Sequence, residues 1–199
     1  EISACLVGSE MCIRDRQMLR AAGYSIVPFD ENVPADVYII NTCSVTNMGD
    51  RKSRQIIRRA KKLNPNAVIA VTGCYAQTAP DEVLAIEGVN LVLGTKDRKN
   101  IVTLVEELNT ESNINHVSDI MSNHEFEELQ IKQYSNRTRA FIKIQEGCNQ
   151  FCSYCIIPYA RGPVRSRAKD DVVREIKELA HNGFKAVSYT HLRAHETGR

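Results

Sequence analysis

Three cysteines, Cys148, Cys152 and Cys155, lie within eight residues in the spacing C-x3-C-x2-C. Thiolates are the soft ligands that iron–sulfur clusters and zinc prefer. Three thiols without a nearby fourth leave one coordination position open, and an open position on a metal centre indicates chemistry. The alternative is a structural zinc site completed by a distant His or Cys, but structural zinc motifs usually pair their ligands as C-x2-C.

Two further cysteines, Cys43 and Cys74, each follow a short apolar segment. Residues 35–41 (ADVYIIN) and 67–72 (AVIAVT) are rich in β-branched residues and predict buried strands. Each cysteine then lies just beyond the carboxyl end of a strand, where ligands gather in open α/β sheets. Taken singly, such a cysteine is more often core packing than a metal ligand.

The elements predicted around these strands alternate in type. They are helices at 47–63, 80–87 and 97–108 and a third strand at 89–93. The order βαβαβα favours a parallel sheet with helices packed on its faces.

A polar stretch at 109–136 ends this pattern and predicts a linker. Alternating residues at 139–145 (RAFIKIQ) predict a new strand, and helical spacing predicts a helix at 170–181. Residues 147–167 between them form a loop rich in Cys, Pro and Arg. We therefore expect a domain boundary in the polar stretch.

The composition is that of an ordinary soluble chain: 199 residues, 43% hydrophobic, 25% charged, with a formal charge of +2. The sequence has no apolar run of about 18 residues and no secretory start, which predicts a cytoplasmic protein without membrane contact. Seven cysteines, an odd number, argue against a disulfide framework and for reduced thiols.

The C-x3-C-x2-C motif with Tyr154 before its third cysteine resembles the signature of radical S-adenosylmethionine enzymes. The resemblance implies a [4Fe-4S] cluster on Cys148, Cys152 and Cys155, whose open iron binds S-adenosylmethionine and cleaves it to a 5'-deoxyadenosyl radical. It also implies that Tyr154 lies against the adenine.

The segment that follows, residues 156–167 (IIPYARGPVRSR), resembles the methylthiotransferases within this group. In that family small and basic residues line the substrate side, so the resemblance makes Arg161, Arg165 and Arg167 substrate-side candidates. A solvated basic loop is the alternative for each arginine.

Upstream, Asn41-Thr42-Cys43 and the segment 73–77 (GCYAQ) resemble two auxiliary-cluster motifs of the same family. The resemblance implies that Cys43 and Cys74 hold a second [4Fe-4S] cluster. It further implies an α/β fold: an N-terminal Rossmann-like parallel-sheet domain, followed by the first βα unit of a truncated radical SAM (β/α) barrel. The expected ranges are 17–110 for the first domain, 111–136 for the linker and 137–186 for the barrel start.

Both ends of the chain depart from the family pattern. Residues 1–16 and 187–199 resemble translated sequencing-adaptor sequence, and we expect both segments to be foreign and without function. The family's first cluster cysteine is expected before Gln17. Cys5 and Cys12 fall near that place, but neither is assigned to the cluster.

Residues 46–59 resemble the MtaB branch of the family, which modifies N6-threonylcarbamoyladenosine beside the anticodon of tRNA. The resemblance implies a tRNA substrate, a reducing partner such as flavodoxin or ferredoxin, and S-adenosylmethionine used as methyl donor and radical source. Seven basic residues crowd the predicted helix there, as expected either for phosphate contacts or for a solvated helix face: Arg51, Lys52, Arg54, Arg58, Arg59, Lys61 and Lys62.

Two other functions stay open: a RimO-like modifier of a ribosomal protein and a non-catalytic zinc-binding RNA module. The resemblance implies that most of the barrel and the family's C-terminal RNA-binding domain are missing from the chain. We therefore expect no turnover by the isolated polypeptide.

Overall fold

The computed structural model describes residues 3–7, 12–30, 33–43, 47–108, 110–122, 126 and 139–190, with the backbone alone at 5–7, 12–14, 47, 48, 139, 141 and 186–190. The chain divides into two compact units, Glu1–Ile120 and Met121–Arg199. Among the helices described, none is both long and apolar enough to cross a membrane.

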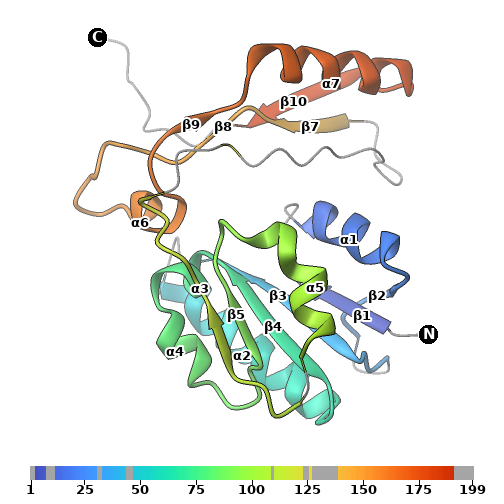
Figure 1. Ribbon diagram of the computed structural model, residues 1–199, viewed down its shortest axis with the longest axis vertical. Coiled ribbons are helices and arrows are strands. Elements are labelled where there is room, and N and C mark those ends of the chain that lie inside the picture. The colour runs from blue at the N-terminus through green and yellow to red at the C-terminus, as the bar shows by residue number, and fades with distance from the viewer. Residues whose placement is uncertain are drawn as a thin grey trace. The chain divides into compact units, whose positions relative to one another are not determined.

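The first unit is built on a six-stranded sheet in which every neighbouring pair of strands is parallel, in the order β2-β1-β3-β4-β5-β6 (Figure 1). The chain moves in opposite directions from β1 to β2 and from β3 to β4, so the topological switch point lies between β1 and β3. The strands are β1 (Ser3–Val7), β2 (Ser25–Val27), β3 (Val37–Thr42), β4 (Val68–Gly73), β5 (Leu91–Leu93) and β6 (Ile114–His116).

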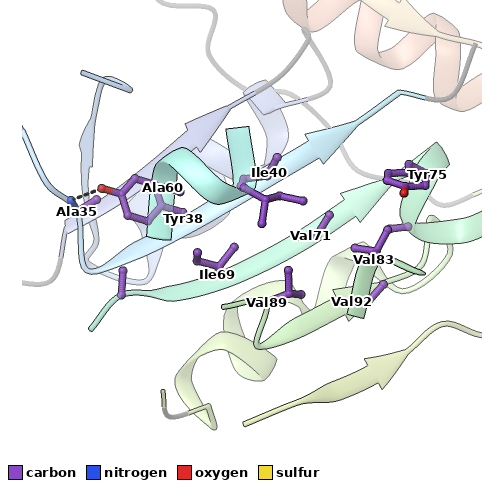
Figure 2. Packing of buried hydrophobic residues seen from close by; sticks show 13 residues of the cluster. Ala35, Tyr38, Ile40, Ala60, Ile69, Val71, Tyr75, Val83, Val89 and Val92 are labelled. Carbon is purple, nitrogen blue, oxygen red and sulfur yellow. Dashed lines mark hydrogen bonds between the residues drawn. The ribbon is translucent and has the colours of Figure 1, made fainter. Parts of the chain in front are cut away.

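Helices cover both faces of this sheet. Along β3, Tyr38 and Ile40 pack in one apolar cluster with residues of α2, α3 and α4, part of which Figure 2 shows. The alternate residues Val37 and Ile39 pack in a second cluster with residues of α1 and α5. Period-2 alternation with both faces buried explains why the central strands are continuous apolar runs. The helices are α1 (Cys12–Ala21), α2 (Asn47–Leu63), α3 (Cys74–Thr78), α4 (Pro80–Leu84), the 3-10 helix η1 (Arg98–Asn100) and α5 (Ile101–Glu106).

The second unit contains a βαβ arrangement. Strands β7 and β10 pair in parallel, and α7 lies between them in the sequence, which is how a (β/α) barrel begins. A short antiparallel pair, β8 with β9, brackets the cysteine-rich loop. The elements are β7 (Arg139–Lys143), β8 (Gln145–Glu146), α6 (Ile157–Arg161), β9 (Arg165–Ser166), α7 (Lys169–His181) and β10 (Ala186–Thr190).

The predicted α/β class with a parallel sheet is confirmed, but several elements differ from the prediction, two of them near the candidate site or the predicted linker. Cys74 follows the carboxyl end of β4, as predicted, and begins the short helix α3, for which the sequence analysis made no prediction. Residues 114–116, predicted as part of a linker, form β6 and pair with β5. All three β6 residues are exposed, so this edge strand has no apolar pattern that could reveal it.

Parts of both predicted foreign ends are built into sheets. β1 lies between β2 and β3, and β10 pairs with β7. Short runs of β-branched and apolar residues pair readily wherever a strand edge is available. The foreign origin of 1–16 and 187–199 and the domain boundaries stay predictions; residues 191–199 and most of 123–138 lie outside the described residues.

Candidate functional site

Cys43 and Cys74 are neighbours at the carboxyl edge of the first sheet. In the register of β3 with β4, Thr42 is the partner of Gly73, and each cysteine is the next residue of its strand's chain. Cys43 is exposed, whereas Cys74 is buried; both are free thiols. The fold thus brings together the two cysteines that the sequence assigned to one auxiliary site.

Gly73 makes this close approach possible. Its φ is +97°, and a Cβ built there would lie 2.3 Å from the backbone oxygen of Thr42. Thr42 completes the corner, because its Oγ1 donates a hydrogen bond to the backbone oxygen of Thr72 at 2.6 Å and accepts one from the Ala76 amide at 3.4 Å. A residue with a side chain at position 73 would therefore push the two cysteine-bearing turns apart.

The residue after Cys74 ties this edge to two helices. The Tyr75 hydroxyl accepts a hydrogen bond from Arg54 Nη1 at 2.8 Å and donates one to Glu82 Oε2 at 3.2 Å. The Arg54 guanidinium also lies 5.7 Å from the centre of the Tyr75 ring. Because Arg54 belongs to α2 and Glu82 to α4, the start of α3 is held from both sides.

In the second unit, the loop with the three clustered cysteines starts at Gly147, directly after β8. Gly147 has φ +84°, and a Cβ there would lie 2.1 Å from the backbone oxygen of Pro163, so only glycine fits. The Cys148 amide donates to the backbone oxygen of Gly162 at 3.1 Å, and the Val164 amide donates to Asn149 Oδ1 at 2.9 Å. The two ends of the loop are therefore pinned to each other.

Inside the loop, Cys148 is buried and Cys152 and Cys155 are partly exposed, all three as free thiols. The Cys155 amide donates to the backbone oxygen of Cys152 at 2.9 Å, which forms a turn. Phe151 has a left-handed φ of +46°, and its ring meets that of Tyr159 edge-on with centroids 5.8 Å apart.

The part of the chain that the structure describes contains no group of three Cys, His, Asp or Glu side chains placed to hold a metal ion. The chemistry of the donors nevertheless fits an iron–sulfur cluster: three free thiols in one pinned loop supply three soft ligands and leave one iron open. The auxiliary edge supplies two thiols. The side chains of Cys5 and Cys12 lie outside the described residues.

The four remaining candidates differ in exposure. Tyr154 is 89% exposed, so its ring is available to a ligand. The three arginines instead meet carboxylates of their own unit. Arg161 Nη1 lies 2.9 Å from Glu146 Oε1, Arg165 Nη2 lies 3.4 Å from Glu146 Oε2, and Arg167 pairs with Glu175. Their assignment to the substrate side stays a prediction, and the solvated-loop alternative does not describe Arg165, which is buried.

Glu146 is a residue that the sequence analysis missed. Besides the two arginines, Lys143 Nζ lies 2.6 Å from its Oε2. Burial raises the pKa of the Glu146 carboxyl, but the charges of Lys143, Arg161 and Arg165 and the hydrogen bond from Lys143 outweigh burial and lower the pKa to about 2. The one available signal was an acidic residue directly before Gly147-Cys148 in an otherwise basic segment.

Sequence comparisons divide the chain as the structure does. Residues 7–94 match the model of an uncharacterized protein family, UPF0004, and residues 142–191 match that of the radical SAM superfamily. A radical S-adenosylmethionine methyltransferase, TsrM from Kitasatospora setae, solved with tryptophan and a SAM analog, has a similar fold: the TM-score is 0.62 at 17% identity, covering 96% of this chain and 48% of that one. The chain is therefore an α/β protein with a six-stranded parallel sheet followed by the start of a radical SAM region, as predicted.

Three curated relatives indicate which family within the radical SAM superfamily the chain resembles. The threonylcarbamoyladenosine tRNA methylthiotransferase MtaB of Bacillus subtilis is 50% identical over 87% of this chain and 38% of its own length. MtaB of Aquifex aeolicus is 44% identical over 84% of this chain and 41% of its own length. The tRNA-2-methylthio-N(6)-dimethylallyladenosine synthase of Desulfotalea psychrophila is 35% identical over 91% of this chain and 42% of its own length.

The chain belongs to the MiaB-like methylthiotransferase family, as the motifs predicted, and is a homologue of MtaB. It spans about 40% of the length of the curated relatives that it matches. Radical SAM proteins of this family bind [4Fe-4S] clusters and S-adenosylmethionine.

Proposed function

We propose that this chain is part of a cytoplasmic tRNA methylthiotransferase that adds a methylthio group at C2 of N6-threonylcarbamoyladenosine next to the anticodon. The observation that carries the proposal is the presence of two separate cysteine sites in one chain of this family. One site is the pinned loop with Cys148, Cys152 and Cys155, and the other is the strand-edge pair Cys43 and Cys74. The names of the Bacillus subtilis and Aquifex aeolicus relatives, both threonylcarbamoyladenosine tRNA methylthiotransferases, support the choice of nucleoside.

In this proposal Cys148, Cys152 and Cys155 ligate one [4Fe-4S] cluster, and Cys43 and Cys74 contribute two ligands to another. When bound, the clusters and S-adenosylmethionine supply reductive radical cleavage and sulfur transfer. Cys148 would supply a buried thiol ligand, and Cys152 and Cys155, joined by the turn between them, would supply two partly exposed ones. The exposed ring of Tyr154 provides a stacking surface for the adenine of S-adenosylmethionine.

Anaerobic iron–sulfur reconstitution of the whole 199-residue chain tests the cluster assignments. We expect brown protein. Replacing Cys148, Cys152 and Cys155 by Ala should remove about four irons per chain, as expected for one [4Fe-4S] cluster. Replacing Cys43 and Cys74 by Ala should remove a different set, leaving the radical-type cluster. Colourless protein that takes up zinc would instead support the non-catalytic binding module.

The substrate assignment is tested on the complete parent protein. Incubation with tRNA, S-adenosylmethionine and a flavodoxin- or ferredoxin-type reductant should give a methylthio product on N6-threonylcarbamoyladenosine, detected by mass spectrometry of the nucleosides. A product on a ribosomal protein alone would overturn the choice of tRNA. We expect the isolated chain to give no product, because it spans about 40% of the length of its curated relatives and its described residues form one βαβ arrangement of the barrel.

A further inference from the structure

Helix α2 is unusually rich in positively charged residues, and most of them are exposed. Its 17 residues include seven Lys or Arg and one acidic residue, Asp50. We define the basic face of α2 as its five exposed cationic residues: Arg51, Lys52, Arg58, Arg59 and Lys62.

The helix presents these side chains outward because its opposite side is anchored in the core. Ser53, Ile57 and Ala60 are buried, and Ile57 and Ala60 join the apolar cluster against the sheet. Residues three and four apart share one side of a helix, so anchoring these positions fixes which residues face solvent.

Two basic residues outside this face are engaged within the unit: Arg54 binds the Tyr75 hydroxyl, and Lys61 Nζ donates to the backbone oxygen of Pro65 at 2.6 Å. On the basic face, Arg59 lies over the Phe29 ring at 5.4 Å. Within the described ranges, however, the side chains of Arg51, Lys52, Arg58 and Lys62 make no ion pair or hydrogen bond. The stability of the fold therefore does not explain these four charges.

The chemistry of the face favours a polyanion over a protein. The one other exposed residue among positions 51–62 is Gln55, so the surface has no exposed apolar or aromatic side chain. Protein interfaces need such side chains at their centre and are depleted in Lys, whereas clustered cations are the footprint of phosphate contacts.

The face also begins beside a proposed site. α2 starts four residues after Cys43, and Arg54 contacts Tyr75, the residue after Cys74. A helix of 17 residues extends about 25 Å, long enough to follow several phosphates away from this edge.

We propose that the basic face of α2 binds the phosphate backbone of the RNA substrate and guides it toward the strand edge with Cys43 and Cys74. The identity of that RNA as tRNA rests on the proposed function, but binding itself requires neither cluster nor turnover.

The test measures binding of a fluorescent tRNA transcript to the whole chain at a series of KCl concentrations. A variant with Arg51→Gln, Lys52→Gln, Arg58→Gln and Lys62→Gln removes four charges from the face. The slope of log K against log salt is negative, and each lost phosphate contact makes it less steep by about 0.7–0.9. For four lost contacts we expect the slope to become less steep by about three. Circular dichroism should be unchanged, since the replaced side chains are exposed.

The matched control removes four exposed lysines elsewhere: Lys99→Gln, Lys169→Gln, Lys177→Gln and Lys185→Gln. It changes the net charge equally and should leave most of the slope intact. An equal loss of slope in both variants would overturn the proposal, and so would the absence of RNA binding by the unaltered chain. Displacement of the RNA by poly-glutamate at equal charge would also overturn it, because it would indicate an acidic protein partner. RNA binding without iron uptake would contradict the proposed function but would still support RNA binding by the basic face of α2.

Discussion

Glu146 joins the cysteine loop to the strands that precede and follow it. Its carboxylate meets Lys143 from β7, Arg161 from α6 and Arg165 from β9. The residue is buried, and so is Arg165. Because three cations surround one acid, loss of the acid leaves uncompensated positive charge in a poorly solvated place. We therefore regard Glu146 as the electrostatic centre of this loop.

Glu146→Gln should lower the free energy of unfolding of the second unit by about 3 kcal/mol at neutral pH. Folding lowers the pKa of this carboxyl from 4.5 to about 2. The stabilisation is therefore fully present above about pH 4.5 and is lost as pH falls toward 2. Urea unfolding of the unaltered chain and of Glu146→Gln from pH 7 to 3 measures this pH dependence. Glu178→Gln, at an exposed position, is the control. A difference that does not shrink at acid pH would contradict the charge-based explanation.

Gly73 limits the distance between Cys43 and Cys74. Gly73→Ala should destabilise the first unit by about 2 kcal/mol or more, because it combines an unfavourable positive φ with a collision against Thr42. Gly23→Ala is the matched control: its φ is +89°, but no atom lies within 4 Å of the added Cβ. Urea unfolding of both variants separates the two effects, and equal losses would mean that the collision with Thr42 is unimportant.

At the scale of elements, Asn90 connects three strands. Its Oδ1 accepts a hydrogen bond from the Ile69 amide in β4 at 2.9 Å, and its Nδ2 donates to the backbone oxygens of Thr110 and Ser112 before β6 at 3.0 and 3.2 Å. Asn90 is 3% exposed. This bonding explains how an exposed three-residue strand such as β6 is kept at the sheet edge.

Asn90→Ala should release β6 while leaving the central strands in place. The buried Ile69 amide loses its acceptor, which costs about 1–3 kcal/mol. Hydrogen exchange should therefore accelerate at Ile69 and Ile114 but not at Ile39 in β3. Uniform acceleration throughout the sheet would show instead that Asn90 stabilises the whole unit.

The elements that sequence could predict are those with strong patterns. The helix at 47–63 has the predicted bounds, because its apolar periodicity is clear and Asn64-Pro65 ends it. β6 was missed because its stabilising contacts come from Asn90, distant in sequence. At the site, spacing identifies the cysteines, but the ion pairs of Glu146 depend on the packing of four elements. The positions of such partners could not be derived from local sequence.

At the scale of the whole chain, two compact units carry the two cysteine sites. Gly73 lies in the first unit and Glu146 in the second. The nearest neighbours of Gly73 lie in the first unit and the ion-pair partners of Glu146 in the second, and mutations without shared partners usually add within about 0.5 kcal/mol. The double variant Gly73→Ala, Glu146→Gln should therefore lose the sum of the two single losses in free energy of unfolding. A coupling energy above about 1 kcal/mol would show that the units depend on each other for stability.

The pairing of Thr42 with Gly73 also restricts how this part of the gene can change length. Removing one residue from β3 or β4 would shift one cysteine by about 3.3 Å along its strand and turn the flanking side chains to the opposite face of the sheet. Codon insertions and deletions are thus tolerable only in the connections outside the paired region. For Cys43 and Cys74, the number of residues in each strand is as strict a requirement as the thiols themselves.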